Sequence, residues 1–187
     1  MVMHIDDIKA LAKSAHGDAE VRERLFATLL GAQTSSSAIA SDGGDRCRPS
    51  RRYTTRSQDK EASNAAWALT HLPKEDNIYI NMYRAELVQL AVTTLEVPLR
   101  RLSMVLLERL EWGRDDVRTD LLDFCLEHMM LADEPYGVKA LCIKLAYQQC
   151  RHYPELCAEL KQCLLLMGPS ELGAGVKHTR EKILKLL

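Results

Sequence analysis

The stretches of sequence that decide the fold are Val97-Pro98-Leu99-Arg100, Tyr136-Gly137-Val138-Lys139 and Gly173-Ala174-Gly175-Val176-Lys177. In each of them, a turn that contains proline or glycine leads to an apolar residue and then to a cation, and apolar residues at helical spacing follow. The three cations lie 38 to 39 residues apart. A repeat of this length is typical of stacked helix pairs, because one pair cannot bury its apolar face alone. The sequence therefore predicts an all-α array.

The repeat predicts three consecutive helix pairs. The first helices of the pairs are expected at 78–93, 116–131 and 154–167. The second helices are expected at 98–111, 137–151 and 175–187, and several of them are apolar nearly all round, which is typical of helices sandwiched between neighbours. Shorter helices are expected before them, and Asp18 and Asp116 are the expected N-caps of two helices.

Composition limits the classes of protein. The chain has 187 residues, of which 47% are hydrophobic and 27% charged, and we expect a single domain over residues 1–187. The net charge of −1 gives no global attraction to nucleic acid or to an acidic membrane. The first residues lack the pattern of a secretory signal, and no apolar run reaches the roughly 18 residues of a membrane span. We therefore expect a cytoplasmic protein.

Residues 33–57 differ from the rest of the chain. They are rich in Ser, Gly, Asp, Arg and Thr, and Gly43-Gly44 and Arg48-Pro49 interrupt any continuous helix. We predict a flexible basic loop, with Arg48, Arg51 and Arg52 as candidate contacts to a nucleic-acid backbone. The alternative is a solvated loop without a ligand, because aspartates interleave with these arginines.

Short helix pairs with a cation just inside the second helix resemble HEAT repeats, over roughly residues 60–187. The resemblance implies a right-handed α-α superhelix, a HEAT/ARM-like solenoid of antiparallel helix pairs with the second helices on its concave side. It also implies a non-enzymatic scaffold that holds a protein or peptide on that side. We predict no catalytic residues, no metal site and no cofactor.

Five cations of the second helices are candidate binding residues: Arg100, Arg101, Lys139, Lys177 and Arg180. In a stacked array, the equivalent ones would form a ladder able to bind an acidic peptide or a phosphate backbone. The alternative interpretation is structural, with each cation paired to a carboxylate just before it. The candidate carboxylates are Glu96 for Arg100, Asp133 or Glu134 for Lys139, and Glu171 for Lys177.

Two further resemblances concern enzymes. Segments 66–74 and 140–147 are similar to short uncharacterised bacterial proteins, some of which are labelled adenylosuccinate lyase. That lyase superfamily resembles a longer enzyme with a Met-Pro-Lys-Asn-Pro loop, whereas here Ser35-Ser36-Ser37 is followed by Ala38-Ile39, so lyase activity is not predicted. HEAT-like arrays also resemble DNA alkylation repair glycosylases, for which Trp67 and Asp115-Asp116 are the candidate residues; the near-neutral charge disfavours this alternative.

Six cysteines lack the close spacing of zinc ribbons, and we predict that they are reduced packing residues. A zinc alternative would need four side chains to converge, namely Cys125, His128, Cys150 and His152. Self-association is a further alternative, because the chain ends in Leu186-Leu187.

Overall fold

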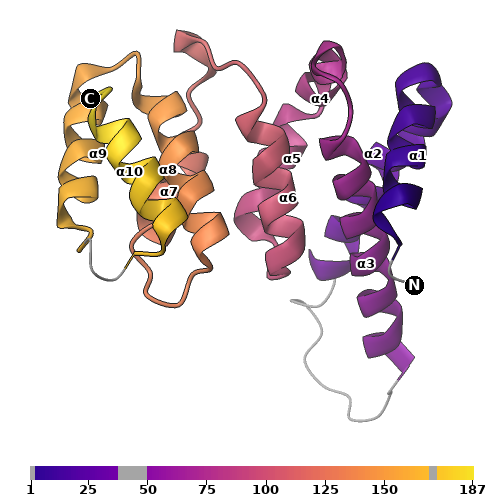
Figure 1. Cartoon of the computed structure of the whole chain (residues 1–187). Helices are drawn as coiled ribbons and strands as arrows, with labels where there is room; N and C mark the ends of the chain where they lie inside the picture. The colour runs from indigo at the N-terminus through magenta and orange to yellow at the C-terminus, as the bar shows by residue number, and fades with distance from the viewer. Residues whose placement is uncertain (1–2, 38–49, 169–171) are drawn as a thin grey trace. The chain divides into compact units, whose positions relative to one another are not determined.

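The computed structural model describes residues 3–37, 50–168 and 172–187, and it describes side chains for 3–31, 58–168 and 172–187. Every regular element in these ranges is helical, which confirms the predicted all-α class (Figure 1). The chain forms two compact units, Met1–Leu106 and Leu107–Leu187. The handedness of a superhelix and the single domain over residues 1–187 stay predictions.

The first unit is built on three long helices. These are α1 (Ile5–Gly17), α2 (Ala19–Ser37) and α3 (Ser50–Thr70), and each contacts the other two. The 3-10 turn η1 (Lys74–Asp76) leads into α4 (Asn77–Met82), α5 (Arg84–Thr93) and α6 (Val97–Glu108). The core is made by apolar side chains such as Ile8, Leu29 and Leu69, which are fully buried. α2 also contacts α5, and the ring of Phe26 stacks on Tyr83 at a centroid distance of 4.2 Å.

The second unit follows the carboxyl end of α6. The 3-10 turn η2 (Arg114–Asp116) precedes α7 (Thr119–His128), α8 (Tyr136–Cys150), α9 (Pro154–Leu166) and α10 (Ala174–Leu184). α8 contacts α7, α9 and α10, and most of its residues are buried. This second helix is therefore sandwiched between neighbours, as its apolar sequence predicts.

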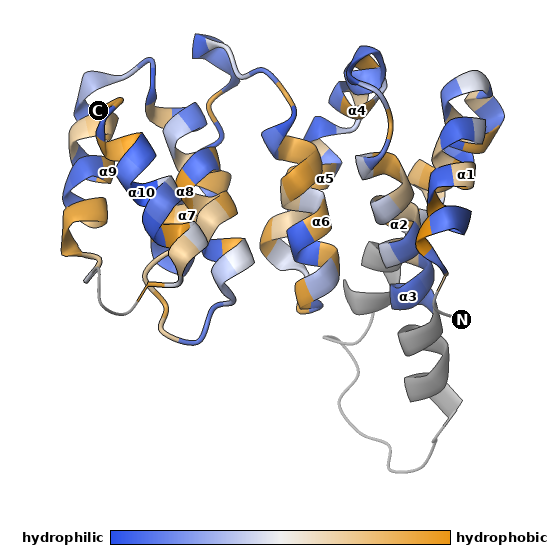
Figure 2. Ribbon diagram, in the orientation of Figure 1, coloured by the Kyte–Doolittle hydropathy of each residue, from blue (hydrophilic) through white to orange (hydrophobic). Residues whose placement is uncertain are grey.

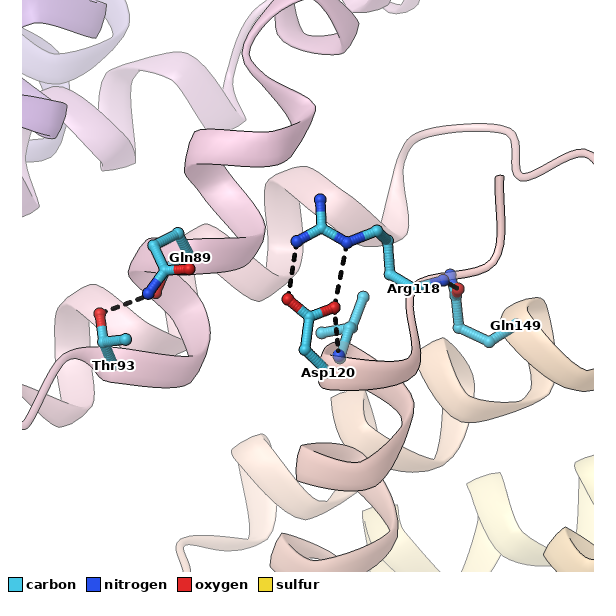
Figure 3. Close-up of polar contacts among 6 residues, drawn as sticks. Gln89, Thr93, Arg118, Asp120 and Gln149 are labelled. Atoms are coloured by element: carbon cyan, nitrogen blue, oxygen red, sulfur yellow. Dashed lines mark hydrogen bonds and ion pairs between the residues drawn. The ribbon is translucent and has the colours of Figure 1, made fainter. Parts of the chain in front are cut away.

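The connection from α6 to α7 is attached to the carboxyl end of α8. The Arg151 guanidinium donates to Trp112 O at 2.7 Å, and the Gln148 side chain donates to Glu108 O at 3.1 Å. Figure 3 shows the third attachment, in which the backbone N–H of Arg118 donates to the Gln149 side chain at 2.8 Å. The Arg118 guanidinium holds the Asp120 carboxylate through two hydrogen bonds. These contacts fix the start of α7, although the sequence of the connection has no helical periodicity.

Some predicted helix boundaries are wrong. The helix expected at 78–93 is two helices, α4 and α5, divided at Tyr83. The helix expected from Asp116 begins at Thr119, because the Asp116 carboxylate accepts the backbone N–H of Gly113 within η2 instead of capping α7. The expected N-cap Asp18 is confirmed, since its side chain accepts the N–H of Glu20 at 2.8 Å.

The helices extend into the range that was predicted to be a loop. α2 continues to Ser37 and α3 begins at Ser50, whereas residues 38–49 lie outside the described residues. Serine, threonine and arginine are tolerated within helices, whereas Gly43, Gly44 and Pro49 are strong breakers and all lie between the two helices. The predicted loop 33–57 is therefore too long at both ends.

Candidate functional site

Three of the five candidate cations of the second helices have a backbone carbonyl near the end of the preceding helix as partner, namely Arg100, Lys139 and Arg180. Arg100 Nη2 donates to Thr94 O, the C-cap of α5, at 2.8 Å. Arg180 Nε donates to Leu164 O in the last turn of α9 at 2.6 Å. The carbonyls at a helix carboxyl end lack partners within the helix and carry partial negative charge, so a cation stabilises them. These two cations hold one helix of a pair to the other.

Lys139 has the same kind of contact in a longer form. Its Nζ lies 3.5 Å from Ala132 O in the turn after α7, and the residue is only 6% exposed. Of its two predicted carboxylate partners, Glu134 instead accepts a hydrogen bond from His128 Nδ1 at 2.6 Å. The burial of Lys139 leaves little of it for a ligand and favours the structural interpretation.

Arg22 makes the equivalent contact in the first helix pair. Its Nη1 donates to Ala15 O at 2.9 Å at the end of α1, and the residue is 8% exposed. Its guanidinium lies 3.6 Å from the centre of the Tyr79 ring. Arg22 is not among the candidate residues predicted from the sequence. It nevertheless has the feature that makes Arg100 and Lys139 candidates, a cation near the start of a second helix.

The other candidate binding residues are placed differently. Arg101 and Lys177 are exposed. Arg51 and Arg52 lie in the first turn of α3, with side chains outside the described residues, and Arg48 lies outside them altogether. The nucleic-acid contact assigned to these three arginines stays a prediction.

The structure adds no support for the zinc alternative or for the DNA repair glycosylase alternative. Among the described residues, no group of three or more metal-ligating side chains is present. Cys125, Cys142 and Cys150 are free and buried, and burial raises the pKa of the Cys150 thiol to about 12. Trp67 is half-buried at the edge of His71, and Asp116 is held by Gly113. Cys157 and Cys163 are free and only partly buried, so the role of the six cysteines as reduced packing residues stays a prediction.

An exposed apolar surface lies at one end of the second unit. Its members come from the turn between α7 and α8 and from the end of α9, and we call them the turn surface: Met130, Leu131, Tyr136, Leu165 and Leu166. Gly173, the N-cap of α10, adjoins the turn before α8, because a Cβ on it would lie 2.8 Å from the Tyr136 ring. In Figure 2, the ribbon at the lower end of α9 has the hydrophobic colour. Leu166 is 74% exposed.

A pocket of about 250 Å³ lies in the first unit, between α1 and the segment that follows α3. Most of its lining surface is apolar, and we call it the basic pocket after its lysine and histidine side chains. Its lining residues are Lys9, Ala12, Lys13, His16, His71 and Pro73. His16 Nδ1 is hydrogen-bonded to the Asp76 carboxylate at 2.8 Å, and His71 Nδ1 to Trp67 O at 3.0 Å. The sequence analysis missed this pocket; the spacing of Lys9, Lys13 and His16 on one helix face was the available signal.

Comparisons with known proteins give one match. A family model described as a HEAT repeat domain matches residues 37–187. No curated protein and no solved structure matches the chain. In the part of the chain that the structure describes, no helix has both the length and the hydropathy needed to cross a lipid bilayer.

Proposed function

Because the chain belongs to the HEAT repeat family, we propose that it is a non-enzymatic interaction module that binds an apolar segment of a protein partner on the turn surface. Helical repeat proteins of this kind present extended surfaces to partners. The proposal moves the contact away from the cations of the second helices, since Arg100, Lys139 and Arg180 are engaged with backbone carbonyls.

The observation that supports this proposal is the exposure of five large apolar side chains in the second unit, on the turn between α7 and α8 and at the end of α9. Single exposed apolar residues are ordinary, but contiguous exposed apolar groups mark interaction sites. Methionine adapts to different partner shapes, and tyrosine is enriched among the residues that dominate binding energy. Full burial of one leucine contributes about 1.5–3 kcal/mol.

The test begins by identifying the partner through the surface itself. A photo-crosslinking amino acid at position 166 in the full chain, followed by mass spectrometry, should identify a protein linked at this end of the second unit. The identified protein is then purified, and its affinity for the full chain is measured by calorimetry. Replacing Leu165 and Leu166 with serine should weaken that affinity at least tenfold, because the apolar burial is lost.

A matched control comes from the first unit. Ile78 and Leu95 are also strongly exposed, so Ile78→Ser with Leu95→Ser makes the same chemical change at sites outside the turn surface. The control variant should bind with unchanged affinity. Equal affinities for wild type and the Leu165/Leu166 variant, or crosslinks only to a second copy of the chain, would refute the proposal of a separate protein partner.

A further inference from the structure

The basic pocket of the first unit combines four cationic or protonatable side chains around one small volume. Lys9 and Lys13 are one helical turn apart on α1, and His16 lies at the end of the same face. His71 reaches the pocket from the end of α3. The volume of about 250 Å³ corresponds to roughly eight water molecules. It therefore suits a small charged group together with part of the molecule that carries it.

Lys9 and Lys13 have no internal role in the structure. Neither ammonium group has a hydrogen bond or an ion pair within the part of the chain that the structure describes. They are not needed at the carboxyl end of α1 either, because Arg22 Nη1 already contacts Ala15 O at 2.9 Å and His16 O at 3.5 Å. Both positive charges are thus available to a ligand.

The two imidazoles are oriented by acceptor groups. The carboxylate of Asp76, which is 5% exposed, and the carbonyl of Trp67 accept hydrogen bonds and cannot donate them. Nδ1 therefore carries the proton in both histidines, and Nε2 is the ring nitrogen left for a ligand. A protonated Nε2 can donate a hydrogen bond to an anion in the pocket.

We infer that this pocket binds a phosphate monoester dianion. Four of the six lining residues can carry a positive charge, and a doubly charged group with three terminal oxygens can use more of them than a single carboxylate does. A metal cation is disfavoured, since two ammonium groups would repel it. The phosphate group has two sources, a phosphorylated side chain of a protein or a small phosphorylated metabolite. The inference does not rest on the turn surface, which belongs to the second unit.

The test uses the full chain at low ionic strength, where screening is weak. Inorganic phosphate, phosphoserine and glucose 6-phosphate are titrated in turn, with unmodified serine and glucose as blanks. We expect saturable binding of the three phosphates, with NMR shifts at His16 and His71. Tighter binding of phosphoserine assigns a protein side chain as the source, and tighter binding of glucose 6-phosphate assigns a metabolite.

Charge-matched variants complete the test. Lys9→Gln with Lys13→Gln should weaken phosphate binding at least tenfold while the helical circular dichroism is retained, since both residues are exposed. Lys161→Gln with Lys182→Gln removes the same charge from exposed positions of the second unit and should change the affinity less than twofold. Absence of saturable binding, or equal weakening by both pairs, would overturn the inference. So would tighter binding of a DNA oligonucleotide that is lost in the first pair, because it would assign a phosphodiester ligand.

Discussion

Two groups of cations in the first unit differ in their surroundings. Arg22 is buried, lies over the Tyr79 ring and donates to the end of α1, whereas Lys9 and Lys13 on α1 itself are exposed and have no partner among the described residues. Arg100 and Arg180 make carbonyl contacts like that of Arg22. The two groups thus differ in whether the cation already has a carbonyl partner within the chain, which position in the sequence alone does not reveal.

The largest effect is expected at Arg22. The substitution Arg22→Met keeps much of the side-chain volume but leaves Ala15 O without its charged donor. We expect a loss of about 2–3 kcal/mol in the free energy of unfolding, as for a buried hydrogen bond to a charged group. Urea denaturation followed by circular dichroism measures it. Lys9→Met is the control on the neighbouring helix, and an equal loss in both variants would contradict the assigned role of Arg22.

The next effect is expected at Arg180 in the second unit. Its guanidinium donates to Leu164 O at 2.6 Å but is only partly buried, so solvent replaces some of the lost hydrogen bond. Arg180→Met should lower the free energy of unfolding by about 1–2 kcal/mol. Amide hydrogen exchange in α9 and α10 should speed up, because their packing is loosened. The exposed Lys177→Met in the same helix should leave that exchange unchanged; a comparable acceleration would contradict the capping role.

The sequence allowed much of the fold to be predicted and little of the candidate sites. The spacing of Arg100, Lys139 and Lys177 correctly indicated helix pairs, because each apolar stripe must be buried by a neighbour. The same spacing could not distinguish a binding ladder from helix capping, because the acceptors of Arg100 and Lys139 are backbone carbonyls, which every sequence contains. The basic pocket depends on α1 meeting the end of α3, a contact between residues about 60 positions apart. No local pattern reports such a contact.

Asp120 provides an intermediate case, a charged group that is bound yet partly exposed. The hydrogen bonds from Arg118 lower the pKa of its carboxyl below the usual value (Figure 3). The contribution of Asp120 to the free energy of unfolding is therefore fully present above the unfolded-state pKa of about 4, and this contribution is lost as the pH falls through the folded-state pKa. Solvent screening limits the contribution to about 0.5 kcal/mol. Asp120→Asn should destabilise the chain by that amount at neutral pH and have no effect in strong acid.

The comparison at pH 7 and near pH 2 requires the free energy of unfolding of wild type and Asp120→Asn under both conditions. Asp123→Asn is the control, because Asp123 is an exposed residue on the same helix without a contact among the described residues. A difference between Asp120→Asn and wild type that grows as the pH falls would have the wrong sign for a carboxyl whose pKa is lowered.

The smallest effect is expected at Lys13, and its sign is opposite to that at Arg22. Lys9 and Lys13 are like charges four residues apart on α1, so removing one of them relieves a repulsion of about 0.2–0.5 kcal/mol. Lys13→Gln should therefore raise the free energy of unfolding in buffer without phosphate, while it weakens phosphate binding. Ser14→Gln, at the next exposed position, is the control for helix propensity. A charged residue whose role is to bind a ligand is expected to lower the free energy of unfolding when the ligand is absent. If Lys13→Gln instead lowers the free energy of unfolding, Lys13 stabilises the helix packing, as Arg22 does, and the prediction is wrong.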